Sequence, residues 1–175
     1  MTTPRLLPVF LALPALAQPA PAPPEAEAAR KAAQAFYDWY AAMAMKSSKE
    51  PAFERALREK RAALTEDLAK ALAADAAAQK AVPDDIVGLD WDPFLNAQDS
   101  HPRYAAGAVR AEGKGFLVAM HGVTGGKKGA EVLFVVEMVP KGGTFVIGNV
   151  RGPKGGDLMT SLKGLAEERK KMGKK

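Results

Sequence analysis

Residues 104–151 read YAAGAVRAEGKGFLVAMHGVTGGKKGAEVLFVVEMVPKGGTFVIGNVR, and this stretch decides the fold class. Runs rich in β-branched and aromatic residues alternate in it with short glycine-containing turns, which is typical of antiparallel hairpins. Four strands are predicted: Tyr104–Ala111, Phe116–Val123, Ala130–Val139 and Thr144–Arg151. Because Val132–Val136 is apolar at every position, we expect that strand to lie in the middle of the sheet.

A helix is predicted upstream, over about Glu25–Met45. It has an apolar face, made by residues at spacings of four and three: Phe36, Tyr40 and Met43. Trp39 lies beside this face. Aromatic residues at helical spacing are more typical of a core than of a ligand pocket. Tyr37 and Asp38 fall elsewhere on the helix, and we expect both nearer the surface.

Two more helices complete the prediction. One runs from about Pro51 to Lys80, where four leucines share a face: Leu57, Leu64, Leu68 and Leu72. Pro83 ends it. The last helix follows the strands, with Asp157 as its N-cap, and ends near Met172. The order of elements predicts an α+β fold, with N-terminal helices packed on an antiparallel sheet of about four strands and a C-terminal helix.

The N-terminus is typical of a secretory signal peptide. A basic Arg5 precedes an apolar run, which ends in the small-residue pattern Ala15-Leu16-Ala17, and we expect cleavage between Ala17 and Gln18. The run is too short for the about 20 apolar residues that span a membrane. We therefore divide the chain into a signal peptide at 1–17, a Pro/Ala-rich spacer at 18–24, a single domain at 25–172 and a basic tail at 173–175.

The chain contains no cysteine, which excludes disulfides, thiolate metal sites and a lipid anchor on an N-terminal cysteine. We expect a periplasmic or secreted protein without a transmembrane or lipid anchor. Its charge is uneven: Gln18–Pro102 holds 10 Lys and Arg against 14 Asp and Glu, whereas Arg103–Lys175 holds 14 against 6. The basic half lacks interleaved aromatic residues that stack on bases, so nucleic acid is not an expected partner.

The segment between the second helix and the strands is the candidate site. It holds five aspartates and no Lys or Arg, and the polar residues of interest are Asp90, Asp92, Asn96, Gln98 and Asp99. Such side chains cap backbone amides in turns, and that is the interpretation we favour. Recognition of a partner or ligand is the second interpretation. A calcium ion held by Asp90, Asp92 and Asp99 is the third, although the spacing does not fit an EF-hand. We expect an ordered loop pinned by Trp91 and Phe94.

Two segments carry a family resemblance. The aromatic stretch Phe36-Tyr37-Asp38-Trp39-Tyr40 and the stretch Leu89-Asp90-Trp91-Asp92-Pro93-Phe94-Leu95-Asn96-Ala97-Gln98-Asp99 resemble a bacterial family known as domain of unknown function 3828. The resemblance covers roughly Ala28 to Leu165. It implies a small exported envelope domain with the cone-shaped fold of nuclear transport factor 2, in which a curved antiparallel sheet wraps helices. It implies no activity, because that fold hosts enzymes and binding modules alike.

The sequence therefore predicts a non-catalytic envelope domain that binds a protein partner or a small ligand. The expected surface joins the Asp90–Asp99 loop to Tyr37 and Trp39 of the first helix. The alternative is an enzyme that uses a pocket of the cone, with Asp99 or His121 as general acid or base. Nucleophilic catalysis has little support, because the chain has no cysteine and no Gly-x-Ser-x-Gly motif.

Overall fold

The computed structural model describes residues 23–82, 85–98 and 100–172. The predicted signal peptide with its cleavage at Ala17 and Gln18, nearly all of the spacer, the basic tail and Asp99 lie outside the described residues.

The sheet has the predicted antiparallel form. Its path runs β1 (Arg103–Glu112), β2 (Gly115–Thr124), β4 (Phe134–Lys141) and β5 (Thr144–Arg151), in that spatial order. The short β3 (Lys127–Lys128), which the sequence did not predict as a strand, pairs with the end of β2. β4 lies between β2 and β5, so the central position expected for Val132–Val136 is confirmed, although β4 begins later, at Phe134.

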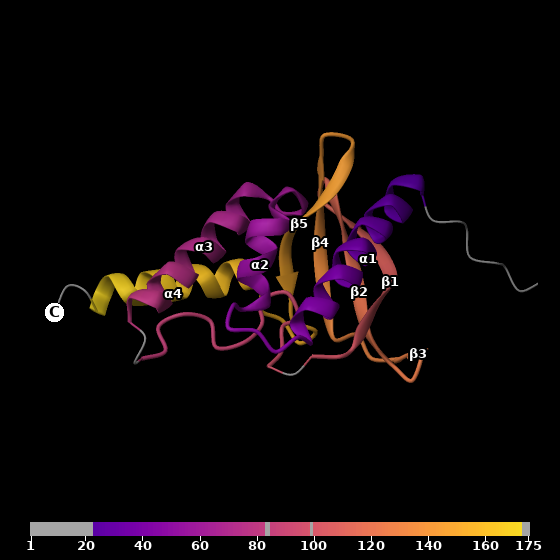
Figure 1. Ribbon diagram of the computed structural model, residues 1–175. Coiled ribbons are helices and arrows are strands. Elements are labelled where there is room, and N and C mark those ends of the chain that lie inside the picture. Colours follow the sequence, from indigo (N-terminus) through magenta and orange to yellow (C-terminus); the bar gives the residue numbers. More distant parts are fainter. Residues whose placement is uncertain (1–22, 83–84, 99, 173–175) are drawn as a thin grey trace, which may run out of the picture.

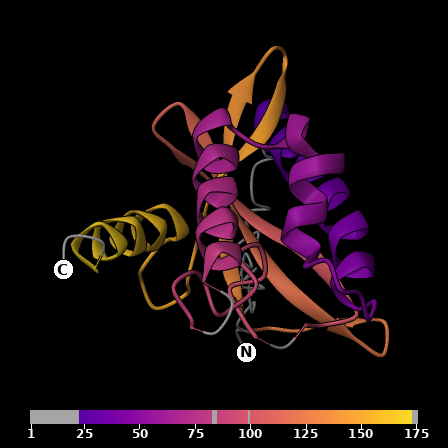
Figure 2. The same cartoon turned by 60° about the vertical axis from the view of Figure 1, so that its left-hand side comes forward.

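In the described part of the chain four α-helices accompany the sheet, which confirms the α+β fold. α1 (Pro24–Ala44) crosses one face of the sheet, while α2 (Ala52–Glu59) and α3 (Glu66–Ala81) lie beside it (Figure 1). α4 (Leu158–Met172) extends away from the sheet (Figure 2) and contacts α3. No helix within the described residues is both long and apolar enough to cross a membrane.

The prediction of one continuous helix over Pro51–Lys80 was wrong. α2 ends at Glu59, a short 3-10 turn follows at Arg61–Ala63, and α3 begins at Glu66. Between them Leu64 adopts an extended conformation, is almost fully buried and forms a bridge with Ile147 of β5. The backbone N–H of Thr65 donates to the carbonyl of Ile147 at 2.9 Å. Contact with the sheet edge therefore interrupts the helical pattern.

Aromatic side chains fill the space between α1, the sheet and the segment that follows α3. Phe36 stacks on Tyr40, and both rings contact Phe94. Tyr37 contacts Phe134 of β4 and is 0% exposed, so its predicted place near the surface was wrong. The reason is that α1 is covered on two sides, by the sheet and by the Phe94 segment, so its buried face is wider than a single stripe.

α4 begins as predicted. The carboxylate of Asp157 accepts the backbone N–H of Thr160 at 2.9 Å and its hydroxyl at 2.8 Å, and the amide of Asn149 also donates to it. Partial burial opposes ionisation, but these hydrogen bonds prevail and lower the pKa of Asp157. The N-cap prediction is confirmed. Leu158 and Leu162 bury the first turns of the helix in the core.

Candidate functional site

An open hollow of about 600 Å³ lies where the C-terminal end of α1 meets the segment between α3 and β1. Its size falls within the about 300–1,000 Å³ typical of ligand pockets. Two separate parts of the chain supply its walls. The lining residues are Met43, Ala44, Lys46, Ser48, Glu50, Pro51, Ala52, Phe53, Leu89, Asp90, Trp91, Asp92, Gln98 and Ser100.

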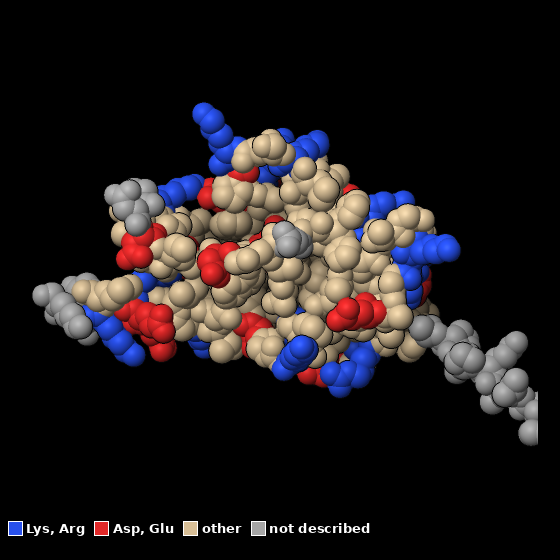
Figure 3. Space-filling model, turned by 90° about the horizontal axis from the view of Figure 1, so that it is seen from below, with Lys and Arg blue, Asp and Glu red and all other residues tan. Residues whose placement is uncertain are grey.

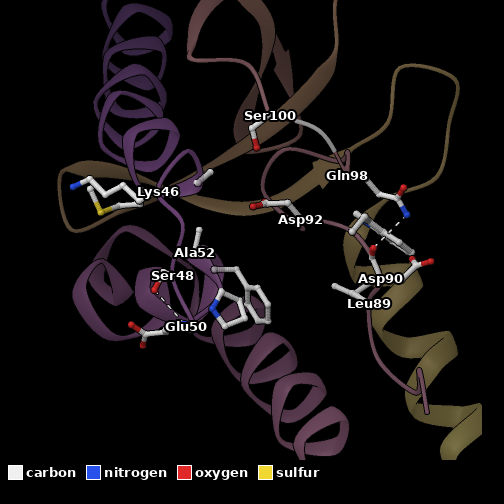
Figure 4. A pocket seen from close by; sticks show the side chains of 14 residues that line it. Lys46, Ser48, Glu50, Ala52, Leu89, Asp90, Asp92, Gln98 and Ser100 are labelled. Carbon is white, nitrogen blue, oxygen red and sulfur yellow. Dashed lines mark hydrogen bonds between the residues drawn. The ribbon is translucent and has the colours of Figure 1, made fainter. Parts of the chain in front are cut away.

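The first wall comes from the end of α1, the connection to α2 and the start of α2. Lys46, Ser48 and Glu50 form its polar part, on one side of the hollow (Figure 4). The Glu50 carboxylate is paired with Arg58 of α2 at 2.8 Å, and the Ser48 hydroxyl accepts the Glu50 backbone N–H at 3.2 Å. Ala52 belongs to the same side of the hollow (Figure 4).

Asp92 lies between the two walls (Figure 4). Its Oδ1 accepts the backbone N–H groups of Phe94 at 3.0 Å and Leu95 at 3.1 Å. The hydroxyl of Tyr40 donates to the same carboxylate, at 2.8 Å from Oδ2. Burial raises the pKa of Asp92, and the hydrogen bonds from Tyr40, Leu95 and Phe94 counteract that rise only in part. Burial, with the Asp92 charge next, also raises the pKa of Tyr40 well above its usual value, so the tyrosine stays a donor.

Asp92 is the first residue of a hydrogen-bonded turn that anchors the loop. Its backbone N–H donates to the carbonyl of Ala97 at 3.0 Å, and that of Asn96 donates to the carbonyl of Asp92 at 2.9 Å. Asn96 has φ of 50°, a left-handed conformation that asparagine tolerates better than most residues. Phe94 is buried inside the turn, and its carbonyl accepts the hydroxyl of Tyr37 at 2.8 Å. The capping interpretation is confirmed for Asp92, and Tyr37 and Asn96 serve the same turn.

The other predicted site residues lie in different places. Asp90 and Gln98 line the second wall of the hollow, where the Gln98 amide is 3.5 Å from the Asp90 carbonyl oxygen (Figure 4). Trp39 does not line the hollow. The ammonium of Lys60 lies over its ring, at 5.4 Å from the centroid. Trp91, expected to pin the loop, is only half-buried and lines the hollow, whereas Leu95 is buried beside Phe94.

No motif in the sequence predicts the first wall as part of a site. Ser48, Glu50 and Ala52 carry no motif, and nothing in their spacing predicts that they face a loop some forty residues away. The one available signal was the polar stretch Lys46–Lys49 followed by Pro51, which marks a connection between two helices.

A polar cluster holds the segment that leads into the second wall. The buried Asp75 of α3 accepts the backbone N–H of Leu89 at 2.9 Å and is paired with Arg169 of α4 at 2.6 Å. Arg169 also donates to the carbonyl of Val87 at 2.7 Å. Gln79 accepts the backbone N–H groups of Val87 and Gly88, each at 3.0 Å. Residues 87–89 are therefore fixed to two helices before the chain reaches Asp90.

His121 lies apart from the hollow. Along β2 it alternates with Met120, which belongs to the core, so its side chain lies on the opposite face of the sheet. There the ring packs on Gly107 of β1, where an added Cβ would be 2.5 Å from Nε2. The ring is 8% exposed, and Nδ1 has no hydrogen-bond partner among the described residues. The structure therefore does not bring His121 to the hollow that Asp90 and Asp92 line.

The charges do not form a continuous patch on the face seen from below, where Lys and Arg are interspersed with Asp and Glu (Figure 3). Within the described residues no group of three or more His, Asp or Glu side chains is placed to hold a metal ion. Asp90 and Asp92, two of the three calcium candidates, both line the hollow. Asp92 already has both carboxylate oxygens engaged by protein donors.

Comparisons of the chain with family models, with curated proteins and with solved structures found no match. The resemblance to domain of unknown function 3828 therefore stays a prediction.

Proposed function

We propose that this protein is a non-catalytic binding domain of the cell envelope, exported after cleavage between Ala17 and Gln18. It binds an extended segment of a protein partner, or a small ligand, in the hollow between the α1–α2 connection and the Asp90–Ser100 segment. The observation that carries the proposal is the convergence of these two stretches, far apart in the sequence, on one open hollow.

The lining has the mixture that binding sites use. Apolar surface comes from Met43, Phe53, Leu89 and other residues, and polar groups of both charges lie among them. Apolar contact supplies affinity, and a few placed polar groups fix the orientation of the ligand. Trp91 is half-buried here, and aromatic side chains of this kind are enriched at recognition surfaces.

The chemistry of Asp92 favours binding over catalysis. A general base needs a lone pair free to take a proton from the substrate. Both Asp92 oxygens accept hydrogen bonds from Tyr40 or from backbone N–H groups of its own turn. Most of the acceptor capacity of this carboxylate is therefore used to hold the wall of the site.

Filling the hollow tests the proposal. The Ala52→Trp variant places a large ring in the hollow, and Ala73→Trp is the matched control because Ala73 is exposed on α3 and does not line it. Each protein is immobilised and incubated with envelope extract from the producing cells. Candidates captured by wild type are then purified, and the affinity of each protein for them is measured by titration. The change in fluorescence is followed in the Trp39→Phe variant, in which Trp91 is the one remaining tryptophan.

We expect Ala52→Trp to weaken binding of the purified ligand at least tenfold, and Ala73→Trp to bind as wild type does. The fluorescence of Trp91 should change on titration. Circular dichroism and thermal melting establish that each variant is folded, and Trp91→Ala gives a second change, in the opposite wall of the hollow, if Ala52→Trp does not fold. Equal affinities for all variants, with no fluorescence change, would exclude the hollow as the binding site.

A further inference from the structure

Among the residues that the structure describes, β1 lies at an edge of the sheet and pairs with β2 alone. The first half of its open edge is closed by a side chain of α1. The Gln34 amide donates to the carbonyl of Tyr104 at 2.9 Å and accepts the backbone N–H of Ala106 at 2.7 Å. A bulge follows, between Ala106 and Val109. Bulges and covering side chains are common ways of preventing unwanted pairing at a sheet edge.

No described residue covers the second half of the edge in this way. β1 and β2 are joined by the two-residue turn Gly113-Lys114, with φ of 57° at Gly113. In a hairpin of this kind the flanking residues, Glu112 and Gly115, hydrogen-bond to each other. By alternation Arg110 also directs its backbone groups toward β2, whereas Val109 and Ala111 direct theirs away from the sheet.

Within the described residues, no hydrogen bond from another element reaches the outward backbone groups of Val109 or Ala111. Ala111 and Arg110 are exposed, and the tip of this hairpin projects from the body of the domain (Figure 2). Unpaired N–H and C=O groups on an accessible strand are a template for a further strand.

We propose that this edge pairs, in antiparallel orientation, with β1 of a second copy of the chain, with the two-fold axis at Ala111. Outward-directed residues of the two copies can pair in three registers, which differ in the residue on the two-fold axis: Ala111, Arg110 or Val109. An axis at Arg110 sets that residue opposite its own copy, and like charges directly opposite are destabilising. An axis at Val109 sets Arg110 opposite Ala108 and joins no opposite charges.

The register centred on Ala111 sets Arg110 of each copy opposite Glu112 of the partner subunit, which gives two cross-strand ion pairs. Within one chain the Arg110 guanidinium is 3.4 Å from Oε2 of Glu112, so both side chains already share a face. The other oxygen, Oε1, is held by Arg151 at 3.1 Å. Oε2 is thus the oxygen that pairs with Arg110, within the chain in the monomer and from the partner subunit in the proposed dimer.

Pairing over so few residues makes a small interface, well below the about 1,600 Å² of a standard stable complex. We therefore expect a weak dimer, visible at high protein concentration and weakened by salt, because exposed ion pairs are screened.

Sedimentation velocity over a concentration series tests the pairing. We expect reversible dimerisation of the purified protein, and at least a tenfold increase in the dissociation constant for Arg110→Glu, which sets Glu opposite Glu112. Lys163→Glu makes the same change of charge on exposed α4 and should dimerise as wild type does. A monomer at every concentration, or equal weakening by both variants, would overturn the proposal.

A disulfide tests the register. The chain has no cysteine, so Ala111→Cys introduces a single thiol at the axis. Paired residues of adjacent antiparallel strands have Cα atoms about 5.5 Å apart, which suits a disulfide. Mild oxidation should therefore link two chains of Ala111→Cys quickly, and the exposed control Ala73→Cys slowly. Equal rates of linkage would show that dimerisation, if present, uses another surface, and the register would be wrong.

Discussion

Asp92 lines the candidate site, but its carboxylate stabilises the wall of that site. Its carboxylate caps Phe94 and Leu95 and accepts the hydroxyl of Tyr40. The sequence indicated capping as the favoured role, because Asp before Pro93 suits a turn. It could not indicate that Tyr40, some fifty residues earlier, is the third donor.

Removing this acceptor should destabilise the domain. Asp92→Ala leaves two backbone N–H groups and the Tyr40 hydroxyl without their partner, and an unsatisfied buried group costs about 1–3 kcal/mol, so we expect a loss of about 3 kcal/mol in the free energy of unfolding. Urea denaturation measures it. Asp90→Ala is the control, because Asp90 is exposed, and its effect should stay within about 0.5 kcal/mol. Equal effects of the two substitutions would contradict the capping role.

We also expect the contribution of Asp92 to the stability of the fold to depend on pH. Burial raises its pKa in the folded state, so the folded protein binds this proton more tightly than the unfolded chain does. The stabilisation from that proton is complete below the unfolded pKa of about 3.9 and is lost as the pH rises through the folded value. Relative to Asp92→Asn, wild type should therefore become less stable from about pH 4 upward and then level off. A difference that grows in favour of wild type as the pH rises would show that its pKa is lowered instead.

Among the elements, the interruption between α2 and α3 shows why one helix was predicted where the protein has two. Leucines at helical spacing continue through Leu64, yet that residue packs against β5 in an extended conformation. A local signal was present: Thr65 followed by Glu66 and Asp67 is a helix start, and the Thr65 hydroxyl accepts the N–H of Leu68 at 3.3 Å. The spacing of the leucines predicted a continuous helix despite this signal, because local spacing carries no information about the contact of Leu64 with a distant strand.

α4 should be necessary for the order of the second wall. Arg169→Met leaves the Asp75 carboxylate, whose side chain is only 4% exposed, without its cation, and breaking a buried pair costs about 3–5 kcal/mol. We expect the free energy of unfolding to fall by about 3 kcal/mol. We also expect faster hydrogen exchange at residues 87–89, measured by mass spectrometry. Lys170→Met, at an exposed neighbouring position, should change neither quantity. Unchanged exchange in Arg169→Met would show that α4 does not fix this segment.

The acidic loop allows a test of the calcium interpretation. Both oxygens of Asp92 accept hydrogen bonds from Tyr40 or the turn, so a cation at this residue would compete with those donors. We therefore expect the same melting temperature with calcium and with chelator. A higher melting temperature in calcium, reversed by chelator and absent from Asp90→Asn, would establish a calcium site at the loop.

For the whole molecule, composition and pattern were sufficient for the class of fold. Glycine turns set the hairpins, and the apolar run at Val132–Val136 predicted the inner position of that strand. The hollow was beyond prediction because only one of its walls, with Asp90 and Gln98, has a distinctive composition. The other wall is made by ordinary residues such as Ser48 and Ala52, which become significant through their place in the fold.

The claim that most depends on the whole fold is that the hollow binds a ligand in the cell. A photoreactive amino acid in place of Trp91 tests it directly, with the same residue in place of exposed Ala73 as control. Illumination of living cells, followed by mass spectrometry of the purified protein, detects covalent adducts at each position. We predict one recurrent adduct at position 91 that is absent at position 73 and is lost when Ala52→Trp fills the hollow. The same adducts at both positions, or none at position 91, would contradict the account.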